Sequence, residues 1–325
     1  MTKLVDGFDR KLSYLRLSIT DLCNFHCQYC LPEGCLKSRK QWLSLSEIRR
    51  AVTAFAELGV AKIRITGGEP SVRKDFMEII KLVASTPGIN EVAYTTNGYH
   101  LYSQAEALHA AGLTTLNVSV DSLMAQNFSY ITGRNCLDKV LLGIKKAQSL
   151  SFNSIKINVV LLKGVNDHEA FDFIDWVKNE SISIRFIELM QTKDNLDYFN
   201  KHHLSPLFIK KELLSKDWVL NSRSSSAGPA AVLSHKDYAG KVGFIMPYNK
   251  SFCSTCNRLR LSSRGGLYLC LFTDISFSLR HLLQDDTQKE ELKQKIIALL
   301  VLKKESHNLN QLETGLTNNL AMIGG

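Results

Sequence analysis

The chain has 325 residues, of which 45% are hydrophobic and 22% charged, with a formal net charge of +9. This length allows one large domain or about two ordinary ones, and no apolar run approaches the ~18 residues of a membrane span. The first residues, Met1 to Gly7, resemble neither a signal peptide nor a transit peptide. We therefore expect a cytoplasmic protein whose eight cysteines ligate metal. Its basic charge favours an anionic partner: nucleic acid, an acidic membrane or a phosphorylated small molecule.

Strands and helices alternate over the first 190 residues. The sequence predicts strands at 14–20, 62–66, 91–95, 115–120, 155–162 and 182–189, and helices at 45–58, 76–84, 103–111 and 137–150 and one that ends near 178. Two capping boxes, Ser44 to Glu47 and Ser103 to Glu106, mark helix starts. About six strand–helix units, where a closed barrel has eight, favour an open, partial parallel βα barrel.

Past Asn200 the alternation stops. We therefore expect the partial barrel to occupy residues 1–200 and a smaller C-terminal region to occupy residues 201–325.

Three cysteines, Cys23, Cys27 and Cys30, follow the first predicted strand at the spacing C-x3-C-x2-C. Thiolates this close repel one another unless a soft metal or a cluster holds them, which indicates iron–sulfur or zinc. A four-iron cluster on three cysteines keeps one iron open to an outside ligand. With the aromatic Tyr29 before the last cysteine, the loop is typical of radical S-adenosylmethionine (SAM) enzymes. The alternatives are a zinc knuckle, which prefers C-x2-C pairs, and buried free cysteines.

A second motif, Gly67-Gly68-Glu69-Pro70, ends the next strand. Glycine lets backbone approach a ligand closely, and backbone carbonyls with the Glu69 carboxylate could hold the ammonium group of an amino-acid-like ligand.

A second cysteine set comprises Cys253, Cys256 and Cys270. It predicts a second four-iron cluster whose open iron binds substrate directly, or a zinc ion with a recruited water. Cys35 and Cys136 are interpreted as spare cysteines.

Several cations lie near these motifs. Arg258 and Arg260 share one face of an extended segment, and Arg16, Arg64 and Lys156 lie on predicted strands. Guanidinium groups suit phosphate oxygens, so the sequence predicts a polyphosphate pocket. A nucleic-acid-binding surface would need an exposed basic stripe or interleaved aromatics, and the sequence has neither.

Over essentially its whole length the chain resembles the GTP 3′,8-cyclase family of molybdenum cofactor biosynthesis, within the radical SAM superfamily. The resemblance is carried by the first cysteine loop, Arg64–Pro70, Thr95–Gly98, Asn117–Asp121, Lys156–Val160, Arg185–Met190, Phe252–Arg260, Cys270–Phe272 and the terminal Gly324 and Gly325. The segment Cys256–Arg260 and the Gly-Gly end are the family-specific parts.

The resemblance implies a lyase with two [4Fe–4S] clusters that converts GTP to (8S)-3′,8-cyclo-7,8-dihydroguanosine 5′-triphosphate. SAM would be cleaved to methionine and a 5′-deoxyadenosyl radical, which takes a hydrogen from the ribose 3′ carbon. The resulting carbon radical would add to carbon 8 of guanine. The reductant would be of the flavodoxin or ferredoxin type, and a pyranopterin monophosphate synthase would use the product. No membrane or nucleic-acid partner is expected, and a homodimer stays open.

The resemblance also implies site residues. The first cluster would be held by Cys23, Cys27 and Cys30, and the second by Cys253, Cys256 and Cys270. SAM would lie among Tyr29, Gly68, Ser119 and Met190. GTP would contact Arg16, Arg64, Thr95, Lys156, Arg258, Leu259 and Arg260. Beyond the clusters and SAM no catalytic side chain is indicated, but the tail, Gly324 and Gly325, would reach the active site and be needed for turnover.

The chain departs from the family at two positions. Gln191 stands where the family often has Pro, and Cys136 stands in an otherwise familiar stretch. The rival hypotheses are another two-cluster radical SAM enzyme, for example a peptide-modifying one, and a basic metal-binding nucleic-acid protein.

Overall fold

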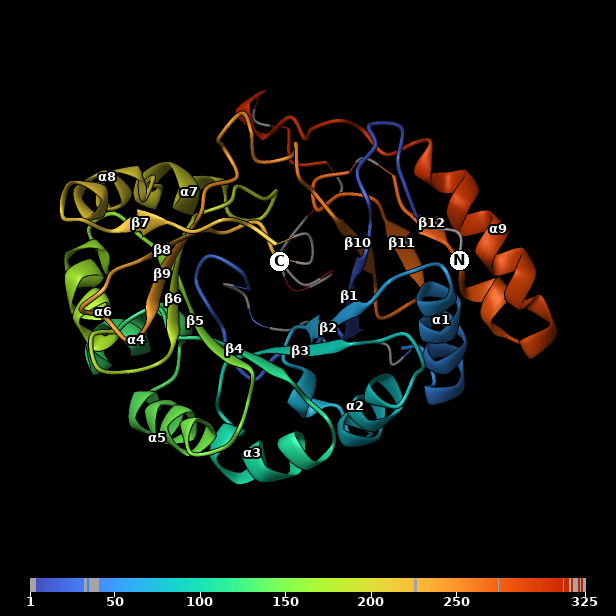
Figure 1. Ribbon diagram of the computed structural model, residues 1–325, viewed down its shortest axis with the longest axis horizontal. Coiled ribbons are helices and arrows are strands. Elements are labelled where there is room, and N and C mark those ends of the chain that lie inside the picture. The colour runs from blue at the N-terminus through green and yellow to red at the C-terminus, as the bar shows by residue number, and fades with distance from the viewer. Residues whose placement is uncertain are drawn as a thin grey trace.

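The structure is a computed structural model that describes residues 4–31, 34, 41–224, 227–273, 275–311, 313–315, 317, 321 and 323. Within these residues one sheet of 12 strands runs in the order β12-β11-β10-β1-β2-β3-β4-β5-β6-β9-β8-β7. The sheet curves into an arc with helices along its outside (Figure 1). Its end strands are β12 and β7, so the barrel is open, as the sequence predicts.

The middle of the sheet is parallel. Its first six strands are β1 (Tyr14–Thr20), β2 (Lys62–Gly67), β3 (Glu91–Thr96), β4 (Thr115–Ser119), β5 (Ser154–Leu161) and β6 (Ser183–Glu188). They pair in chain order. These six match the predicted strands to within one or two residues at each end.

Residues beyond 200 extend the sheet at both edges. On one side β10 (Arg258–Leu261) pairs in parallel with β1, followed by the antiparallel β11 (Gly266–Tyr268) and β12 (Phe277–Ser278). On the other side β9 (Lys241–Ile245) pairs in parallel with β6, followed by the antiparallel β8 (Ala231–Ser234) and β7 (Val219–Leu220). The sequence does not predict these strands.

The helices are α1 (Leu45–Glu57), α2 (Phe76–Ala84), α3 (Leu101–Ala110), α4 (Ala125–Thr132), α5 (Leu137–Gln148), α6 (Ala170–Trp176), α7 (Leu196–His202), α8 (Leu207–Ser215) and α9 (Lys289–Leu300). Among the described residues no helix has both the length and the apolar character needed to cross a membrane. The sequence prediction missed α4, α7, α8 and α9, and none of these has a side-chain N-cap.

One of the two predicted capping boxes is present. At the start of α1, Ser44 Oγ accepts from the backbone N–H of Glu47 and the Glu47 carboxylate accepts from that of Ser44. The box predicted at Ser103 is wrong, because α3 begins two residues earlier, at Leu101. Ser103 is therefore inside the first turn, and its hydroxyl donates to the carbonyl of His100.

The two faces of the parallel sheet differ in chemistry. Side chains that alternate along each strand, such as Leu15 and Leu17 on β1, are fully buried against the helices. Their neighbours on the opposite face, Arg16 on β1 and Arg64 on β2, point into the concave side. The carboxyl ends of the strands therefore surround a polar cavity, the usual place for a binding site in parallel βα folds.

Candidate active site

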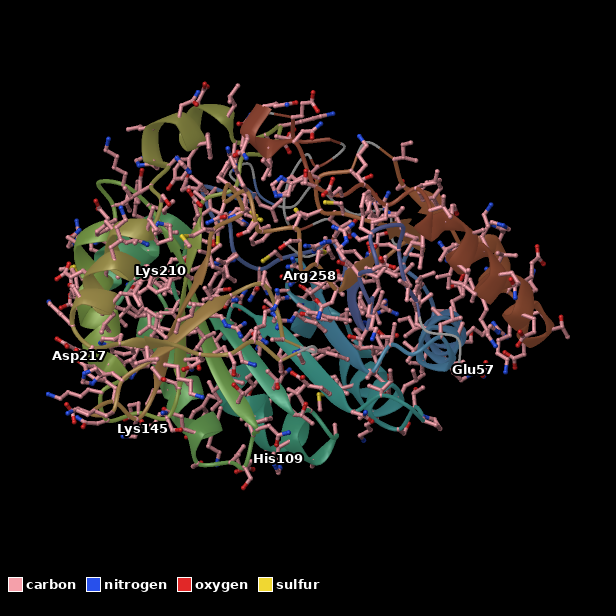
Figure 2. All side chains as sticks on the ribbon, turned by 45° about the horizontal axis from the view of Figure 1, so that its top comes forward. Glu57, His109, Lys145, Lys210, Asp217 and Arg258 are labelled. Atoms are coloured by element: carbon pink, nitrogen blue, oxygen red, sulfur yellow. The ribbon has the colours of Figure 1, made fainter. Side chains whose placement is uncertain are left out.

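All six cysteines of the two predicted sets line one cavity on the concave side. Figure 2 shows Arg258 at the middle of the molecule, among nitrogen and sulfur atoms, whereas Glu57, Lys145 and Asp217 lie at its outer edge. The fold thus brings together two cysteine sets that lie more than 200 residues apart in the sequence.

The first cysteine loop leaves β1 and packs against the end of α4. Backbone N–H groups of His26 and Gln28 donate to carbonyls of Thr132 and Ile131, each at 3.0 Å. Burial raises the pKa of the Cys27 thiol well above its usual value, and the nearby charges of Asp121 and the two other cysteines raise it further. The three thiols are therefore close together in a site that disfavours free thiolates, the environment in which a bound metal cluster stabilises the deprotonated form.

The Gly67-Gly68 pair places the end of β2 directly against this loop. A Cβ added to Gly68 would lie 2.1 Å from the carbonyl oxygen of Leu22, and one added to Gly67 would lie 2.2 Å from that of Thr20. Gly67 also has φ of 139°, a conformation that other residues rarely adopt. The close approach that the sequence predicts is therefore made to the cysteine loop itself, and Gly68 lines the cavity beside it.

Glu69 does not offer its carboxylate to a ligand, contrary to the sequence interpretation. Its side chain is fully buried and accepts five hydrogen bonds. The shortest comes from the Tyr94 hydroxyl at 2.5 Å, and others come from Thr96 Oγ1 and the backbone N–H of Asn97. Glu69 therefore joins β2 to the end of β3, and only the backbone of this motif faces the cavity.

The second cysteine set lies on the loop before β10 and just after β11. Burial favours the neutral Cys256 thiol, but Arg258 and Lys303 outweigh it and lower its pKa to about 7. Burial raises the pKa of Cys253, and the charges of Cys270 and Cys256 raise it further. Because the thiols influence one another's pKa, they lie close together. Two cations lie beside them, and this setting stabilises thiolate ligands.

Each cysteine set offers three thiols to a metal ion or a cluster. Among the described side chains, no three His, Cys, Asp or Glu residues converge on a point where one ion would fit. A zinc ion needs its ligands about 2–2.3 Å away in a tetrahedron. A four-iron cluster instead takes each thiolate at a separate corner iron, so a set of three thiols leaves one iron open to another ligand.

Arginines from four strands converge on the floor of the cavity. The register pairs Arg16 with Arg64 on one side and with Arg260 on the other, so three cations form one row across neighbouring strands. Arg258 and Arg185 also line the cavity. Burial, with the charge of Arg258, lowers the pKa of Arg260 to about 10. Burial, with the charge of Arg64, lowers that of Arg185 to about 10. An anion bound among these like charges would stabilise them.

Several buried polar atoms of this floor have no hydrogen-bond partner within the part of the chain that the structure describes. They include Nε of Arg64 and Arg185, Oγ1 of Thr95 and Oδ1 of Asn158. Unpartnered buried donors are rare in folded proteins. Three donors and an acceptor gathered in one cavity indicate a polar, anionic ligand.

Two of the predicted GTP contacts lie elsewhere. Leu259 is fully buried in the apolar core, because alternation along β10 turns its side chain away from Arg258 and Arg260. Only its backbone is left for a ligand. Lys156 does not line the cavity. It lies two residues before Asn158 on β5 and therefore on the same face of the sheet, nearer the start of the strand. Burial, with the charges of Arg185 and Arg64, lowers its pKa to about 6.

The four residues expected around SAM, Tyr29, Gly68, Ser119 and Met190, all line the cavity. Asp121, which the sequence analysis did not place in the site, joins them. Its Oδ2 accepts from the Tyr29 hydroxyl and its Oδ1 from the backbone N–H of Val160, both at 2.8 Å. Burial raises its pKa to about 6. Its position directly after a predicted strand was the signal. For Arg185, which lies within β6, the signal was the alternation along the strand.

The departure at Gln191 has a structural role. Its backbone N–H donates to the Tyr248 hydroxyl at 3.0 Å, a hydrogen bond that proline cannot make. The preceding carbonyl, of Met190, accepts from Asn195 Nδ2, which also donates to the carbonyl of Tyr29. The Met190 loop is therefore tied to the first cysteine loop.

The remaining expectations fall outside the cavity or outside the described residues. Cys136 caps α5 and lines a separate surface pocket. Cys35, Gly324 and Gly325 lie outside the described residues. Just before the tail, Ala321 lines the cavity and the carbonyl of Ile323 accepts from Arg260 Nη1 at 3.3 Å.

Residues 17–177 match the radical SAM superfamily, and residues 182–309 match the family described as Molybdenum Cofactor Synthesis C. The fold is similar to that of Streptococcus suis SuiB bound to S-adenosylmethionine, with a TM-score of 0.65 and 12% identity over 96% of this chain and 76% of that one. It is also similar to anSMEcpe with bound AdoMet and the Cp18Cys peptide, with a TM-score of 0.57 and 14% identity over 89% and 83%. These similarities show the fold alone.

The open parallel barrel and its matched family model make this a radical SAM enzyme. The chain is 53% identical over 324 residues to the GTP 3′,8-cyclase of Psychromonas ingrahamii, covering 99% of this chain and 96% of that one. It is 52% identical over 323 residues to the GTP 3′,8-cyclase of Tolumonas auensis, covering 99% and 96%. The chain therefore belongs to the GTP 3′,8-cyclase family.

Proposed function

We propose that the chain is the GTP 3′,8-cyclase that converts GTP to (8S)-3′,8-cyclo-7,8-dihydroguanosine 5′-triphosphate in molybdenum cofactor biosynthesis. The enzyme uses SAM and two [4Fe–4S] clusters, as its family does. One observation carries the proposal: two three-cysteine sets and a row of buried arginines line the same cavity. A peptide-modifying radical SAM enzyme would not need this row of cations.

Cys23, Cys27 and Cys30 would hold the cluster that binds SAM. The buried, mutually repelling thiols and their position beside Gly68 support this assignment. Bound there and given one electron, SAM supplies the 5′-deoxyadenosyl radical that removes the hydrogen from the 3′ carbon of GTP. Tyr29, Ser119 and Met190 would lie around SAM, with Asp121 fixing the ring of Tyr29 through its hydroxyl.

Cys253, Cys256 and Cys270 would hold the second cluster, whose remaining iron is open to the guanine base. The charge of Arg258, beside Cys256 and inside the cavity, would stabilise both the thiolates and the bound nucleotide. The cavity contains both cysteine sets. A nucleotide held between them would have its ribose near SAM and its base near the second set.

The triphosphate would lie on the cationic floor. Arg16, Arg64, Arg258 and Arg260 would bind its oxygens with Thr95, and Lys156 would add charge from below. The unpartnered Nε of Arg64 and Oγ1 of Thr95 support this placement, because a phosphate oxygen accepts from each. The backbone of Leu259 would complete the set. The orphaned Nε of Arg185 makes it a further phosphate donor.

The Gly324 and Gly325 tail would close the cavity over the substrate. Ala321 already lines the cavity, and Arg260 already binds the carbonyl of Ile323. A glycine pair beyond these residues is thin enough to enter a space that holds two ligands.

Further partners follow from the chemistry. The electron would come from a flavodoxin- or ferredoxin-type protein, and the product would pass to a pyranopterin monophosphate synthase. The enzyme would act in the cytoplasm, as a monomer or a homodimer.

The proposal is tested with anaerobically reconstituted enzyme, SAM, dithionite and a nucleotide. We expect 5′-deoxyadenosine and the cyclised nucleotide to form with GTP and not with ATP, since the second cluster reads the guanine base. Equal turnover of ATP, or 5′-deoxyadenosine that rises only with a peptide mixture, would overturn it.

A further inference from the structure

Arg10 is a buried arginine outside the cavity that joins three distant segments of the chain. It lies in a short N-terminal turn closed by the bridge between Val5 and Lys11. Its backbone N–H and its Nε donate to the two oxygens of the Asp6 carboxylate at 3.1 and 2.7 Å. The Asp6 side chain is fully buried, and that of Arg10 nearly so. The ion pair thus fixes the guanidinium within the turn.

The other edge of the guanidinium holds two segments near the second cysteine set. Nη1 donates to the carbonyl of Cys253 at 3.0 Å and to that of Glu305 at 2.5 Å, while Nη2 donates to the carbonyl of Lys304 at 2.8 Å. These partners lie 243, 295 and 294 residues away in the sequence. A planar guanidinium with a fixed fork of donors is the side chain that can satisfy a carboxylate and three carbonyls at once.

The two segments belong to the cavity. Cys253 is the first cysteine of the second set, and the segment that begins at Lys304 continues to His307 and Ala321, which line the cavity. Arg10 therefore fixes the Cys253 loop and the start of the C-terminal segment relative to each other.

We propose that Arg10 is a positioning residue that sets the geometry of the second cysteine set and couples it to the C-terminal segment. The proposal rests on the assignment of Cys253, Cys256 and Cys270 to the second cluster. If the Arg10 side chain is replaced, three carbonyls and Oδ2 of Asp6 lose the guanidinium as donor, whereas Oδ1 of Asp6 keeps the backbone N–H groups of residues 8 and 10. The Cys253 loop then loses its tie to the N-terminal turn and to the C-terminal segment. The hydrogen bonds of the Arg10 guanidinium go to Asp6 and to the Cys253 and C-terminal segments, so we expect the effect to fall on the second cysteine set.

The test compares Arg10→Gln and Arg10→Lys with a matched control, Arg73→Gln. Arg73 is similarly buried, and its guanidinium also joins a carboxylate to distant carbonyls, with two bonds to Asp75 and one each to the carbonyls of Ile19 and Leu43. Its partners lie on the first-cluster side of the barrel. Each full-length variant is reconstituted anaerobically, the two clusters are quantified separately by Mössbauer spectroscopy, and hydrogen exchange of residues 253–256 and 304–309 is measured on the iron-free chain.

In Arg10→Gln we expect the iron affinity of the second cysteine set to fall by about 10- to 100-fold, as when partners of metal ligands are removed. The occupancy of the second cluster should fall with it. The first cluster should stay loaded, and both segments should lose exchange protection. Arg10→Lys should lie between Gln and the parent, because an ammonium keeps the charge but not the planar fork. Arg73→Gln should leave occupancy of the second cluster and exchange at both segments unchanged.

Three results would overturn the proposal: parental second-cluster loading in Arg10→Gln, equal loss in Arg73→Gln, or equal loss of both clusters. Cys256→Ala separates this from failure of the ligand assignment. A second cluster that persists in Cys256→Ala refutes the assignment itself, whatever Arg10 does.

Discussion

Lys156 on β5 is the residue through which GTP binding should depend on pH. Burial, followed by the charges of Arg185, Arg64 and Lys62, lowers its pKa from 10.5 to about 6, with Glu91 opposing the shift. One pKa unit corresponds to about 1.4 kcal/mol, so protonating this amine in the free enzyme costs on the order of 6 kcal/mol more than protonating it in water. At pH 7 the free enzyme therefore holds Lys156 mostly as the neutral amine.

A bound triphosphate reverses this balance, because its negative charge favours the ammonium form and raises the pKa of Lys156. Above pH 6, up to the pKa in the complex, each GTP that binds takes up close to one proton. The Kd for GTP should rise by about tenfold for each pH unit in this window. Below pH 6 the amine is already charged, and this dependence should vanish.

The measurement is isothermal titration of anaerobic, cluster-loaded enzyme with GTP between pH 6.5 and 8.5, in buffers of different ionisation enthalpy. Lys156→Met should remove the proton uptake that exceeds the ionisation of GTP itself, and should weaken binding most at the lower pH. Lys145→Met, at an exposed position on α5, is the control and should behave as the parent. A flat Kd in the parent, or equal proton uptake in Lys156→Met, would refute the reasoning.

The same substitution has a second consequence for the ligand-free chain. The pKa of Lys156 is depressed in the folded state, so the unfolded chain binds more protons between pH 6 and 10.5, and stability rises with pH in that window. Lys156→Met should remove this dependence and raise the free energy of unfolding at pH 7.

Three further predictions concern the second cysteine set, the Gly67-Gly68 pair and the buried Glu69 carboxylate. Cys270→Ala should keep the first cluster and part of the SAM cleavage, lose the cyclised product, and lower the iron content by about half; product at the parent rate would refute the second-cluster assignment. Gly68→Ala places a Cβ 2.1 Å from the carbonyl of Leu22, so the first cysteine loop must shift and its iron affinity should fall by about 10- to 100-fold, measured by iron titration. Tyr94→Phe removes one of five donors to the buried Glu69 carboxylate and should lower the free energy of unfolding by about 1–3 kcal/mol in urea; an unchanged midpoint would show that the other donors suffice.

Much of this site follows from the sequence because its parts are local. Each of the first six strands has clear alternation and a glycine or cap nearby, so the strand ends can be located within a residue or two. The first cysteine loop and Gly67-Gly68 both follow such ends. Parallel strands place their carboxyl ends on one rim, and the convergence of these two motifs follows directly.

The parts that the sequence does not predict depend on distant pairing. β10 has four residues and β9 five, and both pair with strands more than 50 residues away in the sequence. Periodicity over so few residues carries little information. Arg10 is missed for the same reason, since its role lies in carbonyls 243 to 295 residues away. The boundary near residue 200 remains a prediction, and strands from both sides of it share one sheet.

The position of β10 explains why the proposed phosphate pocket takes residues from both halves of the chain. Parallel pairing with β1 sets Arg260 beside Arg16, which already faces Arg64 on β2. Neighbouring strands are about 4.8 Å apart, so the row places three guanidinium groups at spacings where like charges repel. This repulsion destabilises the ligand-free protein, and a bound polyphosphate would reduce it. We therefore expect Arg64→Met to stabilise the ligand-free chain in urea while weakening GTP binding. If this variant instead lowered the free energy of unfolding by as much as it weakened the free energy of GTP binding, the arginine row would stabilise the sheet and would not serve the substrate.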